Sequence, residues 1–222
     1  MHRFGKVAIA AVLPLAVGAK ALTAQAVAGI PVYYNPRGGT GISAAANVGF
    51  LKSDAGDAKA YALTGGIGAG PAWITASFGR VNPEGPAEAV NTYGGTVSVK
   101  LFGGGVLPVS IAAQAGVGIL KSGGFTNTSI PIGVGIGLNV PLFPIKPWIA
   151  PRIRMDRVSG GGQSNSETFL GVSAGADFNL LLGLGFHAAV DYEPKKTVSG
   201  VAIPSTMVLG VGAHFNFHVP MM

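Results

Sequence analysis

Large apolar residues alternate with small or polar ones along much of this chain, and this pattern restricts the fold more than any other feature. The segment from Leu182 to Glu193 is a clear case. Its first set of alternate residues is apolar or aromatic: Leu182, Leu184, Phe186, Ala188, Val190 and Tyr192. Its second set is Gly183, Gly185, His187, Ala189, Asp191 and Glu193. Because successive side chains of a strand point to opposite faces, this separation predicts a β-strand and not a helix.

The same separation recurs along the chain and predicts an all-β fold of ten strands. The predicted strands are residues 42–51, 60–68, 72–81, 92–102, 109–120, 130–142, 147–157, 168–180, 182–193 and 207–218. Long polar connections are expected at 52–59, 82–91, 121–129, 158–167 and 194–205, and short ones at 69–71, 103–108, 143–146 and 181. This alternation of long and short connections is typical of an up-and-down meander. Eight strands is the alternative, if 60–68 and 72–81 are assigned wrongly.

Composition excludes several other classes of protein. Glycine accounts for 36 of 222 residues, which disfavours a helical bundle, because an interior helix glycine costs about 1 kcal/mol relative to alanine. A mean hydropathy of +0.47 argues against disorder. With no cysteine, the chain has no disulfides, no thiol catalysis and no lipidated cysteine.

The residues opposite the apolar set indicate which face meets the surroundings. A soluble barrel places Lys, Glu, Thr and Arg on its water-facing side. Here that second face is rich in glycine, at positions Gly49, Gly66, Gly68, Gly79, Gly94, Gly116, Gly118, Gly133, Gly135, Gly137, Gly171, Gly175, Gly183, Gly185, Gly210 and Gly212. Only 11% of residues are charged, and a charge facing lipid at the midplane costs roughly 2–4 kcal/mol. We therefore predict a closed antiparallel up-and-down transmembrane β-barrel, with the apolar face toward lipid and the small residues toward a narrow lumen.

The first residues are typical of an export signal. Arg3 and Lys6 precede an uncharged stretch at 7–19, and Ala24-Gln25-Ala26 matches a signal peptidase site. The predicted organisation is a signal peptide at 1–26, a periplasmic N-terminal arm at 27–38 and the barrel at 39–218. Loss of the signal lowers the formal net charge from +6 to +3, since three of the fifteen basic residues lie in it. Nucleic-acid binding is not expected of the remainder.

These features together resemble the small bacterial outer-membrane β-barrel proteins. The resemblance rests on the signal peptide, the strand pattern and the aromatic last strand, which carries Leu209, Val211, Phe215 and Phe217. It implies location in the cell outer membrane and contact with outer-membrane lipid and lipopolysaccharide. It also implies insertion by the barrel assembly machinery, which in that family commonly recognises a C-terminal aromatic residue. This chain continues beyond Phe217 to Met222.

Charged and imidazole side chains on the predicted inner face are the candidate functional residues. They are Lys100, Arg152, Arg154, Asp156, Asp177, His187, Asp191 and His214. Such residues can form an ion-selective constriction or a salt-bridged plug, and both interpretations stay open at this point. The expected role is accordingly a small pore or a structural barrel, without a cofactor.

Two alternatives follow from the same sequence. His187, Asp191, Glu193 and His214 fall close enough for an acid/base or metal constellation, and outer-membrane enzymes such as lipid A deacylases use Ser, His and Glu on barrel strands. An enzyme acting on lipid or lipopolysaccharide is therefore the alternative, although no serine is placed convincingly beside either histidine and a non-enzyme is expected. The uncharged segments 101–120 and 122–145 also allow a helical membrane protein, which the period of two opposes.

Overall fold

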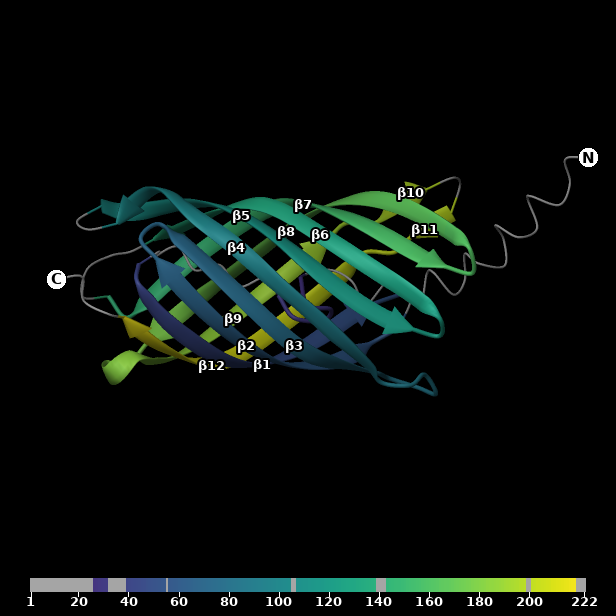
Figure 1. Cartoon of the computed structure of the whole chain (residues 1–222), viewed down its shortest axis with the longest axis horizontal. Helices are drawn as coiled ribbons and strands as arrows, with labels where there is room; N and C mark the ends of the chain where they lie inside the picture. The colour runs from purple at the N-terminus through teal and green to yellow at the C-terminus, as the bar shows by residue number, and fades with distance from the viewer. Residues whose placement is uncertain are drawn as a thin grey trace, which may run out of the picture.

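The strands of this protein close into an antiparallel barrel in the computed structural model, which describes residues 26–31, 39–54, 56–104, 107–138, 143–198 and 201–218 (Figure 1). Within these residues, ten strands form the barrel wall. They are β1 (Gly41–Ser53), β2 (Ala58–Ala69), β3 (Ala72–Pro83), β4 (Val90–Gly104), β5 (Leu107–Ser122), β6 (Phe125–Leu138), β7 (Ile145–Gly160), β8 (Gln163–Asn179), β9 (Leu184–Glu193) and β12 (Thr206–His218). A small hairpin of β10 (Lys196–Val198) and β11 (Val201–Ile203) lies between β9 and β12.

Each wall strand pairs with the next along the chain, and β12 returns to pair with β1. That last pairing runs from Gly41 opposite His218 to Ser53 opposite Thr206. The prediction of a closed ten-stranded barrel is confirmed, and the eight-stranded and helical alternatives are wrong. In the described part of the chain, no helix is long and apolar enough to cross a membrane.

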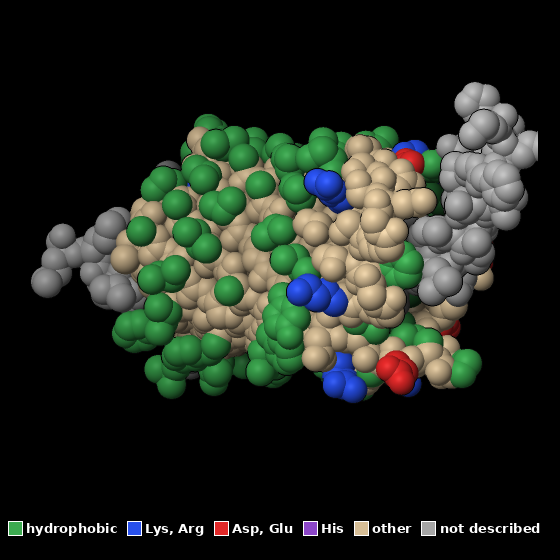
Figure 2. Space-filling model, turned by 45° about the vertical axis from the view of Figure 1, so that its right-hand side comes forward, with side chains coloured by type: hydrophobic (Ala, Val, Ile, Leu, Met, Phe, Trp, Pro, Cys, Tyr) green, Lys and Arg blue, Asp and Glu red, His purple; other side chains and the backbone are tan. Residues whose placement is uncertain are grey.

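Side chains alternate between the outside and the inside of the wall as predicted. In β2, Leu63 and Ile67 are 65% and 60% exposed, whereas Ala60 and Ala62 are 1% and 6% exposed. Large exposed apolar residues occur on all ten wall strands. On the face seen in Figure 2 they form part of a broad apolar belt. A closed wall satisfies the strand hydrogen bonds internally, so this belt can face lipid.

Two of the predicted long loops are instead continuations of strands. The predicted loops 121–129 and 158–167 contain the ends of β5 to β8, and each hairpin turns over two glycines. Gly123 and Gly124 have φ values of 55° and 79°, and Gly161 and Gly162 have 58° and 77°. Positive φ at both central residues is the requirement of a tight hairpin turn, which follows the strand twist. The polar residues here are strand residues beyond the apolar belt.

The start of the predicted strand 182–193 is also corrected. A short 3-10 turn, η1 (Leu181–Gly183), occupies this position, and β9 begins at Leu184. Leu182 has a φ of 61° and is 90% exposed, so it belongs to the connection between β8 and β9. Gly183, with a φ of 82°, is likewise a turn glycine and does not line the wall. Residues 139–142 of the predicted strand 130–142 lie outside the described residues.

The two ends of the barrel differ in their outward-facing charge. We call the end with the connections β1–β2, β3–β4, β5–β6, β7–β8 and β9–β12 the loop end, and the opposite end the turn end. Near the loop end, five strands each carry one exposed basic side chain: Lys52, Lys59, Arg80, Lys121 and Arg157. Figure 2 shows blue side chains at the border between the apolar belt and the polar loop end. We refer to these five residues as the basic collar.

Candidate functional site in the barrel lumen

The N-terminal residues 26–31 lie inside the barrel. Ala26, Val27, Ala28 and Ile30 are each 4–7% exposed. The Ala28 N–H donates to the Thr92 hydroxyl at 3.3 Å. Residues 27–31 of the predicted N-terminal arm thus lie within the wall, while 32–38 and residues 1–25 of the predicted signal peptide lie outside the described residues.

An apolar inner surface explains why the segment is held there. Val27, Ala28 and Ile30 form one buried cluster with wall residues from β1 to β5 and β12, namely Leu51, Ala58, Ala60, Ala62, Val81, Val90, Leu120 and Val208. Burying apolar surface stabilises by about 25 cal/mol per Å². The sequence already indicates such a contact. Large aliphatic residues such as Leu51, Val81 and Leu120 lie on the inner face, and their side chains need an apolar partner there. Sequence reasoning missed it by treating the inner face as uniformly small.

Two wall glycines provide the space for this segment. A Cβ placed on Gly49 would collide with the backbone carbonyl of Gly29, and one on Gly94 would collide with the carbonyl of Ala26. The glycine-rich inner face therefore accommodates the chain's own backbone at these two positions, in addition to narrowing the lumen.

A buried network of ion pairs spans β7, β8 and β9. Arg152 donates to Asp191 at 2.7 Å, to Glu193 at 2.9 Å and to the Ser173 hydroxyl at 2.9 Å. Arg154 donates to Glu193 at 2.8 Å, and its Nε lies 2.9 Å from Asp156. All five charged side chains are 0–7% exposed. The structure thus brings four of the predicted lumen residues, Arg152, Arg154, Asp156 and Asp191, into one network.

Arg154 has a second partner on the inner face. Its guanidinium lies 4.8 Å from the centre of the Phe169 ring, which also has the Lys196 ammonium at 5.2 Å. Cation–π contacts of this kind stabilise a desolvated guanidinium. Phe169 is an inward aromatic residue that the sequence analysis did not select, because its neighbours in register were unknown.

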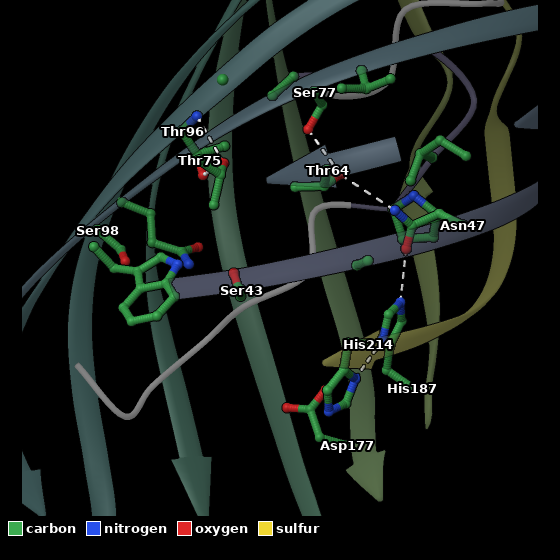
Figure 3. A pocket seen from close by; sticks show the side chains of 18 of the residues that line it. Ser43, Asn47, Thr64, Thr75, Ser77, Thr96, Ser98, Asp177, His187 and His214 are labelled. Atoms are coloured by element: carbon green, nitrogen blue, oxygen red, sulfur yellow. Dashed lines mark hydrogen bonds between the residues drawn. The ribbon is translucent and has the colours of Figure 1, made fainter. Parts of the chain in front are cut away.

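The histidines form a separate group, in a polar cavity of about 140 Å³. His187 Nδ1 lies 2.9 Å from His214 Nδ1, and His187 Nε2 lies 2.7 Å from Asn47 Oδ1. Figure 3 shows the chain of hydrogen bonds continuing from Asn47 to Thr64 and Ser77. The predicted constellation of His187, Asp191, Glu193 and His214 is therefore divided, with the carboxylates bound to arginines and the histidines bound to each other.

Asp177 joins the two histidines in this cavity. A carboxylate oxygen of Asp177 and one ring nitrogen each of His187 and His214 all lie within 4.8 Å of one another (Figure 3). Strand register places Asp177 opposite His187 on β9 and opposite Lys146 on β7. Asp177, His187 and His214 are residue types that commonly ligate metal ions, and the barrel wall brings them together.

Lys100 lies apart from both groups. It is half-buried on the inward side of β4, where a β-bulge shifts the register with β5. Its backbone N–H donates to the Pro71 carbonyl at 2.9 Å, which places it near the turn end. Of the eight predicted residues, four are thus in the ion-pair network, three are in the histidine cavity and one is at the turn end.

Comparisons with known proteins find similarity at the level of solved structures. No family model and no curated protein matches the chain. Neisserial surface protein A is 14% identical, with 79% of this chain and 96% of that chain covered and a TM-score of 0.43. The β domain of the Bordetella autotransporter BrkA is 13% identical, covering 80% and 99% with a TM-score of 0.44. The N-terminal β-barrel domain of Pseudomonas aeruginosa OprF is 12% identical, covering 79% and 97% with a TM-score of 0.37. At 12–14% identity, the likeness is one of fold.

Proposed function

We propose that this chain is an integral outer-membrane β-barrel whose lumen is occluded by its own N-terminal segment. The observation that carries this proposal is the burial of Val27, Ala28 and Ile30 inside the wall. The ion-pair network supports it, because paired and hydrogen-bonded charges fill the space beside β7 to β9. Of the two expected roles, pore and structural barrel, the closed structural barrel has the better support.

The basic collar supports the outer membrane as the location. Lipopolysaccharide carries phosphate groups, and exposed Lys and Arg side chains at the border of an apolar belt can pair with them. Phe215 and Phe217 on the outer face of β12 are 40% and 53% exposed, so they are available to the barrel assembly machinery. Both partners are part of the proposal.

Conductance measurements test the occluded lumen. The full-length protein, refolded and reconstituted into planar bilayers, is expected to give no discrete current steps. A variant without residues 27–31 is expected to give small, reproducible steps, since removal leaves a space between the apolar wall residues and the polar cavity. Regular steps from the intact protein, at a frequency that follows its concentration, would overturn the proposal.

An enzyme acting on lipid or lipopolysaccharide is the less supported proposal. Ser173 is the hydroxyl within the buried network, and its partners in the described lumen are Arg152 and Asp191, with no histidine placed as a base. Comparison of lipid A acylation in cells with and without the protein tests this alternative. A change in acylation that is lost on His187→Ala would favour the enzyme.

A further inference from the structure

The two histidines of the cavity meet through equivalent ring atoms. The rings of His187 on β9 and His214 on β12 meet edge to edge, with centroids 5.2 Å apart and planes within 14° of parallel. Their Nδ1 atoms are 2.9 Å apart. The other nitrogen of each ring points to an amide oxygen, since His187 Nε2 is 2.7 Å from Asn47 Oδ1 and His214 Nε2 is 3.4 Å from Asn179 Oδ1.

This arrangement determines where the proton of His187 lies. An amide oxygen only accepts hydrogen bonds, and Asn47 Nδ2 donates to the Thr64 hydroxyl, so His187 Nε2 carries its proton. A neutral imidazole has a single N–H, which leaves His187 Nδ1 unprotonated. This lone pair faces His214 Nδ1 at 2.9 Å, where it accepts a hydrogen bond from His214 or, when His214 is in its Nε2–H form, ligates a cation together with it.

We propose that His187, His214 and Asp177 bind a divalent transition-metal ion of the Zn²⁺ type inside the lumen. Zn–N bonds of 2.0–2.1 Å in tetrahedral geometry place two ligand nitrogens about 3.3 Å apart, so the rings must separate by roughly 0.4 Å and each must turn until its Nδ1 lone pair points at the metal. The Asp177 carboxylate, within 4.8 Å of both rings, supplies a third ligand through a side-chain rotation. A proton shared between the two histidines would require no third ligand such as Asp177.

The surroundings fit a metal site in two further respects. Metal-bound histidines usually donate their second N–H to a carbonyl or carboxylate, and Asn47 accepts from His187 in this way. The adjoining cavity of about 140 Å³ has room for water as a fourth ligand. The sequence analysis grouped both histidines with Asp191 and Glu193 instead, because Asp177 on β8 meets His187 on β9 and His214 on β12 only through strand register.

Zinc titration of the intact protein tests the site. The full-length chain is purified without a polyhistidine tag, refolded in detergent, treated with a chelator and titrated with ZnCl₂ in a calorimeter near pH 7.5. We expect one ion per barrel. His214→Gln and His187→Gln should each weaken binding at least 100-fold, and the isosteric Asp177→Asn at least tenfold. Asn47→Ala should weaken it by about 10–100-fold through loss of the orienting hydrogen bond.

Matched controls separate this site from accidental binding. Gln114 lines the same cavity without being a proposed ligand, so Gln114→Ala should leave the dissociation constant within twofold of the parent. Ca²⁺ and Mg²⁺, which prefer oxygen ligands, should not compete with zinc. Heat-modifiable migration on gels establishes that each variant is folded, and Asp177→Asn remains informative if a histidine variant fails. Absence of saturable binding in the folded parent, or binding unchanged in the folded ligand variants, would overturn the proposal.

Discussion

At the scale of single residues, Gly49 decides whether the N-terminal segment fits in the lumen. A Cβ at this position would meet only atoms of Gly29 and Ile30 among its nearest neighbours, so Gly49→Ala should expel the segment without disturbing the wall. The matched control is Gly65→Ala, where a Cβ has nothing within 4 Å. Because the chain has no cysteine, Ala28→Cys provides a unique label. We expect its maleimide reaction to be at least tenfold faster with Gly49→Ala and unchanged with Gly65→Ala. Equal rates in both would contradict the buried placement.

Arg152 provides a second prediction at this scale. Arg152→Met keeps most of the side-chain volume but leaves Asp191 and Glu193 with fewer partners in a buried setting. Breaking a buried ion pair by removing one partner costs about 3–5 kcal/mol. The free energy of unfolding in urea, measured in lipid vesicles, should fall by that amount. Arg157→Met on the same strand is exposed and should change it by less than about 0.5 kcal/mol. Similar losses for both variants would argue against the network.

The sequence could predict which lumen residues face inward but not which of them meet. Alternation alone assigns Asp177, His187 and Asp191 to the inner face. Their partners depend on register, which places Ser173 opposite Asp191 and Asp177 opposite His187. Register is set by turn geometry and by the pairing of whole strands. For this reason the histidine cavity and the ion-pair network looked like one site in the sequence and are two in the structure.

At the scale of strands and turns, the number of elements was predictable and their ends were not. The period of two identifies every wall strand, because one face of each is apolar. It weakens where a strand leaves the membrane, as in the polar stretches around Gly123-Gly124 and Gly161-Gly162. There both faces meet water, so the pattern resembles a loop although the hydrogen-bonded ladder continues.

The outward face of β2 supports a prediction about lipid contact. Leu63 lies midway along the strand and is 65% exposed, so Leu63→Arg should place a charge at the bilayer midplane. The expected cost is roughly 2–4 kcal/mol in the free energy of unfolding, with slower assembly into vesicles. Two controls should have small effects, Leu63→Met at the same position and Lys59→Arg in the basic collar. If Leu63→Arg assembled like these controls, the lipid-facing assignment would be wrong.

At the scale of the whole molecule, the basic collar predicts an orientation. If it pairs with lipopolysaccharide phosphates, the loop end faces the outside of the cell and the turn end faces the periplasm. Ser164 and Ala87 are exposed at the loop end, and Ala69 is exposed at the turn end. In intact cells, a maleimide too large to cross the outer membrane should label Ser164→Cys and Ala87→Cys but not Ala69→Cys. All three should react after permeabilisation, and labelling of Ala69→Cys alone in intact cells would reverse the orientation.

The pairing of β1 with β12 has a consequence for how this protein is made. The first and last strands of the wall lie side by side along their whole length, from Gly41 opposite His218 to Ser53 opposite Thr206. Until β12 has been synthesised, β1 therefore lacks the neighbour that completes its hydrogen bonds, and an unpaired strand edge is not tolerated in hydrocarbon. A chain that stops before residue 206 lacks β12, so β1 and β9 would each keep an unpaired edge. Insertion of this barrel is thus tied to completion of its polypeptide, and shortened products should fail to insert and be open to proteolysis.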